Sequence, residues 1–238
     1  MSGALTRGDF HVHSTFSDDA SSTLAENVAA AHAAGLDTVR LVDHVRASTT
    51  WVPDYVAAVA ALDVPDGLTV LTGVETKILD SSGSLDLPPL PPGIDRILIA
   101  DHQFPGDAGP LSPGEVRERI AAGWPAAEAL EMLVSATLLA MTRHPGNQLA
   151  HCFSILPKLG LSEAELTDTQ LSALAQTAAA TDTHVEVNEK WGCPGPRAVA
   201  ALHAAGATVV ASTDSHDAGS VGRYERVREI LSAAGAGS

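Results

Sequence analysis

The sequence predicts an α/β fold in which seven parallel strands, each followed by a helix, close into a barrel. Short apolar runs rich in β-branched residues alternate along the chain with alanine-rich helical segments. A length of 238 residues is ordinary for one barrel-type domain. Closure into a barrel is the economical arrangement of seven such strand–helix units. No repeat or second domain is visible, so residues 1–238 are expected to form one domain, with disorder only at about residues 234–238.

The elements follow from the alternation of apolar periodicity with turn residues. The expected strands are residues 8–12, 38–42, 68–74, 96–100, 148–152, 183–187 and 207–212. The expected helices are residues 24–34, 54–62, 113–122, 125–143, 163–180, 195–205 and 220–234. Thr23 and Ser162 stand where helix N-caps are expected, and Gly35, Gly160 and Gly206 stand where helices should end. Residues 80–84 are typical of a tight turn, so residues 77–86 are expected to form a hairpin before the proline-rich linker 88–92.

Composition indicates a cytoplasmic globular protein. No apolar run reaches 18 residues without a charge, proline or glycine, which argues against a membrane span, and the N-terminus lacks the pattern of a secretory signal. Two cysteines are too few for a disulfide framework, and this fits a reducing compartment. Cys152 follows His151 and could be a soft ligand, but a buried, inert thiol is the favoured interpretation.

The charge balance bears on possible partners. Fourteen basic residues against 29 acidic ones give a formal net charge of −15, and few of the basic residues are lysines. A duplex-binding surface needs clustered Lys and Arg, so long nucleic acid is not expected as a partner. Bound divalent cations could offset part of the acidity, although acidic surfaces that maintain solubility account for most of it.

Histidines and carboxylates recur at the ends of the predicted strands. His11 and His13 alternate on one strand, as do Asp214 and His216 beyond the last one, so each pair can face a common metal. In barrels of this type the carboxyl ends of the strands carry the catalytic groups. All seven predicted strands deliver polar residues to that rim: His11 and His13, Asp43 and His44, Glu75, His102, His151, Asn188, and Asp214 with His216.

These residues resemble the polymerase and histidinol phosphatase (PHP) superfamily, and in particular its histidinol-phosphatase-like phosphoesterases. The resemblance runs in order from about residue 9 to residue 217. It rests on His-Val-His-Ser at residues 11–14 with Phe-Ser-Asp at 16–18, Val-Asp-His at 42–44, Gly-Val-Glu at 73–75, His102, His151, Val-Glu-Val-Asn at 185–188 and Ser-Thr-Asp-Ser-His at 212–216.

The resemblance implies a distorted, seven-stranded, TIM-like (β/α)7 barrel that holds two or three metals through nine ligands. Position by position, it implies a first metal on His11, His13, Glu75 and Asp214. Glu75 would bridge to a second metal, which His102 and His151 complete. Asp18, His44 and His216 would hold the third; Asp19 is the alternative to Asp18, which is favoured. Asp43 and Asn188 would orient ligands or substrate.

The ligand types indicate the chemistry. Mixed imidazole and carboxylate ligands suit Zn²⁺, Mn²⁺ or Fe²⁺. Two metals bridged by Glu75 can share a hydroxide whose parent water has a pKa lowered to about 7, which supplies a nucleophile at neutral pH. Metal coordination of the phosphoryl oxygens would stabilise the charge that develops on them. Asp214 or His216 could then protonate the leaving oxygen, unless a metal-bound water does so.

Recognition of the substrate is expected to involve basic residues near the rim. The candidates are Arg46, Lys77, Arg143, Lys158, Lys190 and Arg197, of which Lys158 and Lys190 rank first. Trp51 and Trp191 could form walls of the pocket, although tryptophan is more often a core residue. The other histidines are expected to be structural, because they lie in helices, before the fifth strand or in the barrel interior: His32, His203, His144 and His184.

The sequence therefore predicts a metal-dependent phosphoesterase that hydrolyses a small phosphorylated metabolite, with histidinol-phosphate-like phosphomonoesters as the functional model. The alternatives are a phosphodiesterase or exonuclease acting on nucleotides or short oligonucleotides, and a metal-stabilised structural or polymerase-associated PHP module. A metal hydrolase acting on a carbon–nitrogen bond is a further alternative. The absence of a polymerase region and the intact ligand set argue against the structural module. No membrane partner is expected.

Overall fold

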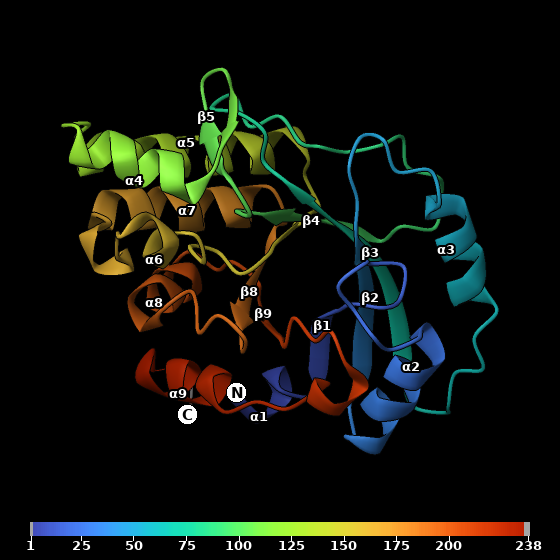
Figure 1. Cartoon of the computed structure of the whole chain (residues 1–238). Helices are drawn as coiled ribbons and strands as arrows, with labels where there is room; N and C mark the ends of the chain where they lie inside the picture. Colours follow the sequence, from blue (N-terminus) through green and yellow to red (C-terminus); the bar gives the residue numbers. More distant parts are fainter. Residues whose placement is uncertain (1, 236–238) are drawn as a thin grey trace.

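The computed structural model describes residues 2–235 and contains a seven-stranded parallel sheet in the order β1-β2-β3-β4-β7-β8-β9 (Figure 1). The two outer strands meet: a parallel bridge joins Val12 to Ser215, and the N–H of His13 donates to the carbonyl oxygen of Ser215 at 2.8 Å. The sheet thus curls into a nearly closed barrel, and the predicted α/β barrel is confirmed. Part of the predicted disordered terminus, residues 236–238, lies outside the described residues.

The strands reproduce most of the prediction. They are β1 (Gly8–Val12), β2 (Thr38–His44), β3 (Thr69–Lys77), β4 (Arg96–Ala100), β7 (Gln148–Leu149), β8 (His184–Asn188) and β9 (Val209–Ser212). The fifth predicted strand was too long, because the chain leaves the sheet after Leu149. His151 and Phe153 have φ of 28° and 74°, values in the left-handed region that a strand does not use. β2 and β3 instead continue past their predicted ends and carry His44 and Glu75 within regular strand.

Helices cover the outside of the barrel. They are α1 (Ser2–Leu5), α2 (Leu24–Ala33), α3 (Val52–Ala60), α4 (Pro113–Ala121), α5 (Ala126–Arg143), α6 (Leu156–Leu159), α7 (Asp168–Ala180), α8 (Pro196–Ala204) and α9 (Arg226–Ala233). Thr23 is the N-cap of α2, as predicted, and forms a capping box in which its side chain accepts from the N–H of Glu26. Gly35, Gly160 and Gly206 all have left-handed φ at helix ends, as predicted.

Two predicted helices are divided or shortened. Residues 163–180 form a 3-10 turn, Glu163–Glu165, and then α7; Leu166 between them is extended, and Thr167 caps the second helix. The last helix begins at Arg226, six residues later than predicted, after the 3-10 turn Ala218–Ser220. The carboxylate of Glu189, from the loop after β8, accepts hydrogen bonds from the backbone N–H groups of residues 225, 226 and 227, so a distant side chain caps α9.

The predicted hairpin at residues 77–86 is present. Ile78 and Leu85 form an antiparallel bridge, and the N–H of Asp86 donates to the carbonyl of Lys77 at 3.1 Å. Gly83 at its tip has φ of +75° and lies against α5, where an added Cβ would be 2.5 Å from the backbone nitrogen of Ala140. A second, unpredicted hairpin is formed by β5 (Phe104–Gly106) and β6 (Gly109–Leu111).

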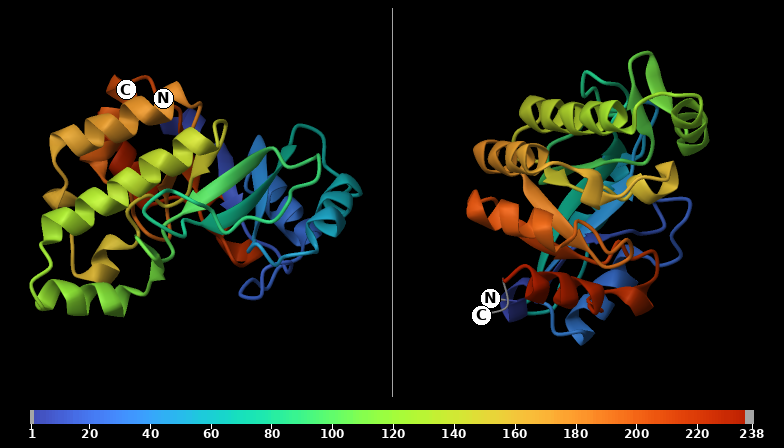
Figure 2. Two further views of the ribbon diagram at one scale, coloured as in Figure 1. Left: turned by 90° about the horizontal axis from the view of Figure 1, so that it is seen from above. Right: turned by 90° about the vertical axis from the view of Figure 1, so that its left-hand side faces the viewer.

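The apolar core lies between the strands and the helices. α5, α7 and α8 stack over one side of the sheet, while α2 and α3 lie over another (Figures 1 and 2). The main cluster packs side chains of α5, α7 and α8, including Leu133 and Leu174, against Ile99 and Val185 of the sheet. No helix among residues 2–235 is both long and apolar enough for a membrane span. The helical shell leaves the carboxyl ends of the strands free to present polar side chains.

Candidate metal centre

A cavity of about 540 Å³ opens at the carboxyl ends of the strands. Its walls combine carboxylates, imidazoles and ammonium or guanidinium groups, which come from the ends of all seven strands of the sheet or from the loops that follow them. The lining includes Asp18, Asp19, His44, Arg46, Glu75, Lys77, His102, His151, Lys190, Trp191, Asp214 and His216. The rim predicted from the strand ends therefore exists as one site.

Glu75 lies at the centre of this site. Its carboxylate is buried, with 1% of the residue surface exposed. Oε1 lies 3.2 Å from His102 Nε2 and 2.9 Å from His151 Nε2. Oε2 lies 2.8 Å from His44 Nδ1 and 3.5 Å from the Nε2 atoms of both His11 and His13. The two oxygens thus face two different groups of imidazoles.

His11, His13 and Asp214 form one compact group of ligand atoms. The Nε2 atoms of the two histidines are 2.9 Å apart, and His13 Nε2 is 3.3 Å from Asp214 Oδ1. Asp214 adopts a left-handed φ of 54° that aims its side chain inward. Its other oxygen accepts a 2.7 Å hydrogen bond from the indole N–H of Trp191.

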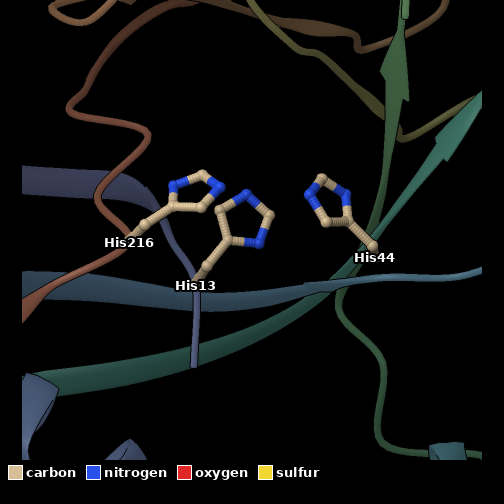
Figure 3. A group of neighbouring side chains, drawn as sticks. All are labelled: His13, His44 and His216. Carbon is tan, nitrogen blue, oxygen red and sulfur yellow. The ribbon is translucent and has the colours of Figure 1, made fainter. Parts of the chain in front are cut away.

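A second group consists of His13, His44 and His216, whose rings face a common space although they come from three separate segments (Figure 3). The carboxylate of Asp19 lies close to both His44 and His216: its Oδ2 is 3.5 Å from His44 Nε2 and 3.2 Å from His216 Nε2. Asp18, the favoured residue in the sequence, also lines the cavity. The structure thus brings Asp19 to these imidazoles.

Two observations show that this donor set suits divalent metals. Glu75 Oε2 is buried, yet it receives no hydrogen bond of acceptable geometry from residues 2–235, although His44 Nδ1 is 2.8 Å away. A buried anionic oxygen without a donor is costly unless a cation neutralises it. The second observation is that imidazole and carboxylate side chains gather in groups of three. Within each group, the ligand atoms all lie within 4.8 Å of one another. Imidazole and carboxylate ligands together suit zinc, manganese and iron.

The electrostatics of the site keep its carboxylates ionised. Burial alone would raise the pKa of Glu75, but the imidazoles of His102, His11 and His44 hold it well below its usual range. The pKa of Asp214 is likewise lowered: the hydrogen bond with His13 and the neighbouring imidazoles outweigh its burial. Both groups are therefore anionic donors throughout the neutral pH range.

Buried groups behind the site hold its histidines. Asp43, predicted to orient ligands, accepts hydrogen bonds from the side chains of Ser14 at 2.6 Å and Ser17 at 2.7 Å. Asp101 was not singled out in the sequence, yet its Oδ1 lies 3.2 Å from His151 Nδ1. Burial opposes protonation of His151, but Asp101 and Glu75 raise its pKa to about 10. The position of Asp101 directly after a predicted strand was the signal available in the sequence.

The basic candidates fall into two classes. Arg46, Lys77 and Lys190 line the cavity. Lys190 Nζ lies 3.5 Å from Asp214 Oδ2 and 3.3 Å from His216 Nδ1. Lys158 instead lies over the indole of Trp191, 4.0 Å from the ring centroid. Lys158 is not among the residues that line the cavity.

The remaining candidates lie away from the cavity surface. The amide of Asn188 is buried and hydrogen-bonded to Glu186 and to the N–H of Trp191. Arg197 contacts carbonyl oxygens of residues 164 and 166 on the helical side, and Arg143 ends α5. Trp51 packs on Phe16 and Tyr55. Cys152 is a free, buried thiol, and burial raises its pKa well above the ordinary value.

Comparison with known proteins agrees with this geometry. The sequence model of the family described as "PHP domain" matches residues 9–189. A protein described as a "probable phosphatase" from Enterobacter sp. (strain 638) is 26% identical over 242 residues, which cover 95% of this chain and 85% of that protein. Another "probable phosphatase", from Thermoanaerobacter sp. (strain X514), is 35% identical over 85 residues, 34% of each chain.

A solved structure shares the fold. The histidinol phosphate phosphatase of Lactococcus lactis subsp. lactis, crystallised with zinc, L-histidinol and phosphate, superposes with a TM-score of 0.64 at 15% identity. The match covers 97% of this chain and 93% of that one. Since the family match spans more than half of the sequence and the strand-end residues form one site, the chain belongs to the PHP domain family.

Proposed function

We propose that the protein is a metal-dependent phosphoesterase that hydrolyses a phosphate monoester of a small metabolite. One observation carries the proposal: five imidazoles lie within 3.5 Å of the Glu75 carboxylate, two beside one oxygen and three beside the other, in an open cavity. The names of the relatives and the phosphate and zinc of the structural neighbour support the same chemistry. Residues 1–238 would act as one domain.

We assign the metal-binding residues from these contacts. One site would use His11, His13 and Asp214 with Glu75, and a second would use His102 and His151 with the other oxygen of Glu75. His44, His216 and Asp19 would form a third, with Asp19 in place of Asp18. Two or three ions of zinc, manganese or iron would be held.

When bound, such metals supply a water-derived nucleophile near neutral pH and stabilise charge on the phosphoryl oxygens. The residues around them position the ester. The side chain of Lys190 is 43% exposed, and its Nζ faces the cavity beside Asp214. This ammonium group can pair with a phosphoryl oxygen. Arg46 and Lys77 lie on the cavity wall as further anion contacts. Asp214 has too low a pKa to be a useful acid at neutral pH. His216 is the protein's candidate proton donor when its third-site metal is absent.

A phosphodiesterase acting on nucleotides or short oligonucleotides is the second candidate. A neighbouring cavity of about 410 Å³ shares Lys190, Asp214 and His216 with the metal cavity and is also lined by Arg223. A longer ester could extend into it. A phosphate-release screen across metabolites and dinucleotides, run with metal analysis of the same preparation, separates the two candidates.

We predict that protein purified without chelator contains two or three divalent transition metals per chain. The reason is the number of imidazole and carboxylate donors around Glu75, whose unpaired oxygen needs a cation. Elemental analysis of the purified chain measures the content. Less than one metal per chain, with no increase after reconstitution, would contradict the proposal.

The choice between Asp18 and Asp19 can be tested by a matched pair of variants. Asp19→Asn should lower the metal content and reduce turnover by about tenfold or more, because it removes the carboxylate that faces His44 and His216. Asp18→Asn should leave metal content near that of the wild type. Loss of metal in Asp18→Asn, with normal metal content in Asp19→Asn, would identify Asp18 as the ligand.

A further inference from the structure

A buried carboxylate beneath the candidate metal centre contacts two of its histidines. Glu186 on β8 has no exposed surface. Its Oε1 lies 2.8 Å from His11 Nδ1, and its Oε2 accepts a 3.1 Å hydrogen bond from the backbone N–H of His151. His11 and His151 belong to different proposed metal sites. One side chain therefore holds residues of both sites that share Glu75.

Glu186 is itself fixed from the barrel interior. Arg40 and Gln148 are buried there, with 2% and 0% of their surfaces exposed. A guanidinium can only donate, and Nη1 of Arg40 donates to the amide oxygen of Gln148. The NH₂ of that amide must therefore face the other way. It donates to Glu186 Oε1 at 2.7 Å and to the carbonyl oxygen of Phe10 at 2.8 Å.

This arrangement selects the ligating tautomer of His11. Glu186 Oε1 already accepts from the amide of Gln148, and a carboxylate oxygen is an acceptor, so the proton between it and His11 is placed on Nδ1. In the neutral imidazole, the form that binds a metal, Nε2 then carries the lone pair. That atom faces the metal centre, 3.5 Å from Glu75 Oε2 and 4.0 Å from Asp214 Oδ1.

His151 is held at two points by two different carboxylates. Glu186 accepts from its backbone N–H, where the left-handed φ of 28° directs the side chain inward. Asp101 instead contacts the ring, with its Oδ1 3.2 Å from Nδ1. Together they present His151 Nε2 to Glu75 Oε1 at 2.9 Å. Asp101 has no such contact with His11, which makes it a control for Glu186.

We infer that Arg40, Gln148 and Glu186 form a chain of positioning residues that couples the two metal sites sharing Glu75. Replacement of Glu186 should lower the metal affinity of both sites, whereas replacement of Asp101 should lower the metal affinity of one site only. The inference rests on the proposed function, because it takes His11 and His151 as ligands of separate metals.

The test is a calorimetric titration of the full chain with Mn²⁺ after chelator treatment. Glu186→Gln should weaken two binding equivalents, each by about ten- to a hundredfold. Asp101→Asn should weaken only one equivalent by a similar factor. An effect of Glu186→Gln confined to one equivalent would overturn the coupling. Failure of the wild-type chain to bind Mn²⁺ or Zn²⁺ would contradict the proposed function instead.

Two variants of Arg40 test the same coupling if Glu186→Gln does not fold. Arg40 contacts none of the proposed ligands, and its guanidinium carbon lies 5.6 Å from the ring centroid of Phe10. Arg40→Met retains an unbranched side chain of similar length but removes the guanidinium group. The amide of Gln148 is then free to turn, so Mn²⁺ binding should weaken. Arg40→Lys restores a donor and should recover part of the loss. Equal Mn²⁺ affinity in the wild type and in Arg40→Met, with both folded by circular dichroism, would show that Arg40 does not act on the metal sites through Gln148 and Glu186.

Discussion

Replacement of Glu75 by glutamine is expected to lower turnover at least about a hundredfold. Glutamine nearly preserves the shape of the side chain but removes its charge and replaces one of its two acceptor oxygens with a donor. Both oxygens of Glu75 face imidazoles, at 2.8 to 3.5 Å, so no rotation of the amide can serve both groups. The measurement is phosphate release at saturating substrate, with metal content determined on the same sample.

Glu163→Gln is the matched control for this variant. Glu163 is partly buried and accepts a 2.8 Å hydrogen bond from the N–H of Gly195, but it does not line the metal cavity. Turnover of this control should stay close to that of the wild type. Near-normal turnover of Glu75→Gln itself, with wild-type metal content, would show that the bridging role is wrongly assigned.

The sequence predicted the barrel and the position of its site because both depend on local periodicity. Alternation on a strand places His11 and His13 on one side of the chain, and parallel strands bring their carboxyl ends to one rim. His44 and Glu75 lie at directly paired positions of β2 and β3. That β2 and β3 are neighbours is expected, because consecutive strands in such folds usually pair.

What the sequence did not settle depends on loop conformation. Asp18 and Asp19 are adjacent in a turn after β1, and only the path of that loop decides which carboxylate reaches His44. The early end of the fifth strand has the same origin. The left-handed conformation of His151 is imposed by contacts with residues far away in the sequence, including Glu186.

The roles of Asp101 and Glu186 also could not be predicted from the sequence. Asp101 directly follows the apolar strand β4, and Glu186 lies between two valines of β8. Such positions identify a buried charge but not its partner. Their partners are 50 and 175 residues away in the chain, His151 for Asp101 and His11 for Glu186. Contacts of this kind depend on the closed barrel, so periodicity alone could not reveal them.

The last prediction separates a small-molecule enzyme from one that acts on long nucleic acid. Binding of long DNA gains free energy from releasing counterions, and this requires many Lys and Arg side chains along the surface. The chain has a net charge of −15, and two of the three basic residues in the metal cavity are paired: Lys77 with Asp86 and Lys190 with Asp214. A compact ester needs only the metals and one or two such cations.

We therefore expect phosphate release from small monoesters to exceed cleavage of long single- or double-stranded DNA at matched concentration and metal content. The cavity of about 540 Å³ is of the size that holds a metabolite, and the net charge of −15 on the whole chain disfavours binding of an extended polyanion. Parallel assays at low and at physiological salt make the comparison, since DNA binding through phosphates weakens steeply with salt. Efficient, salt-sensitive degradation of long DNA without activity on monoesters would instead place the protein among nucleases, because only extended backbone contacts produce that salt dependence.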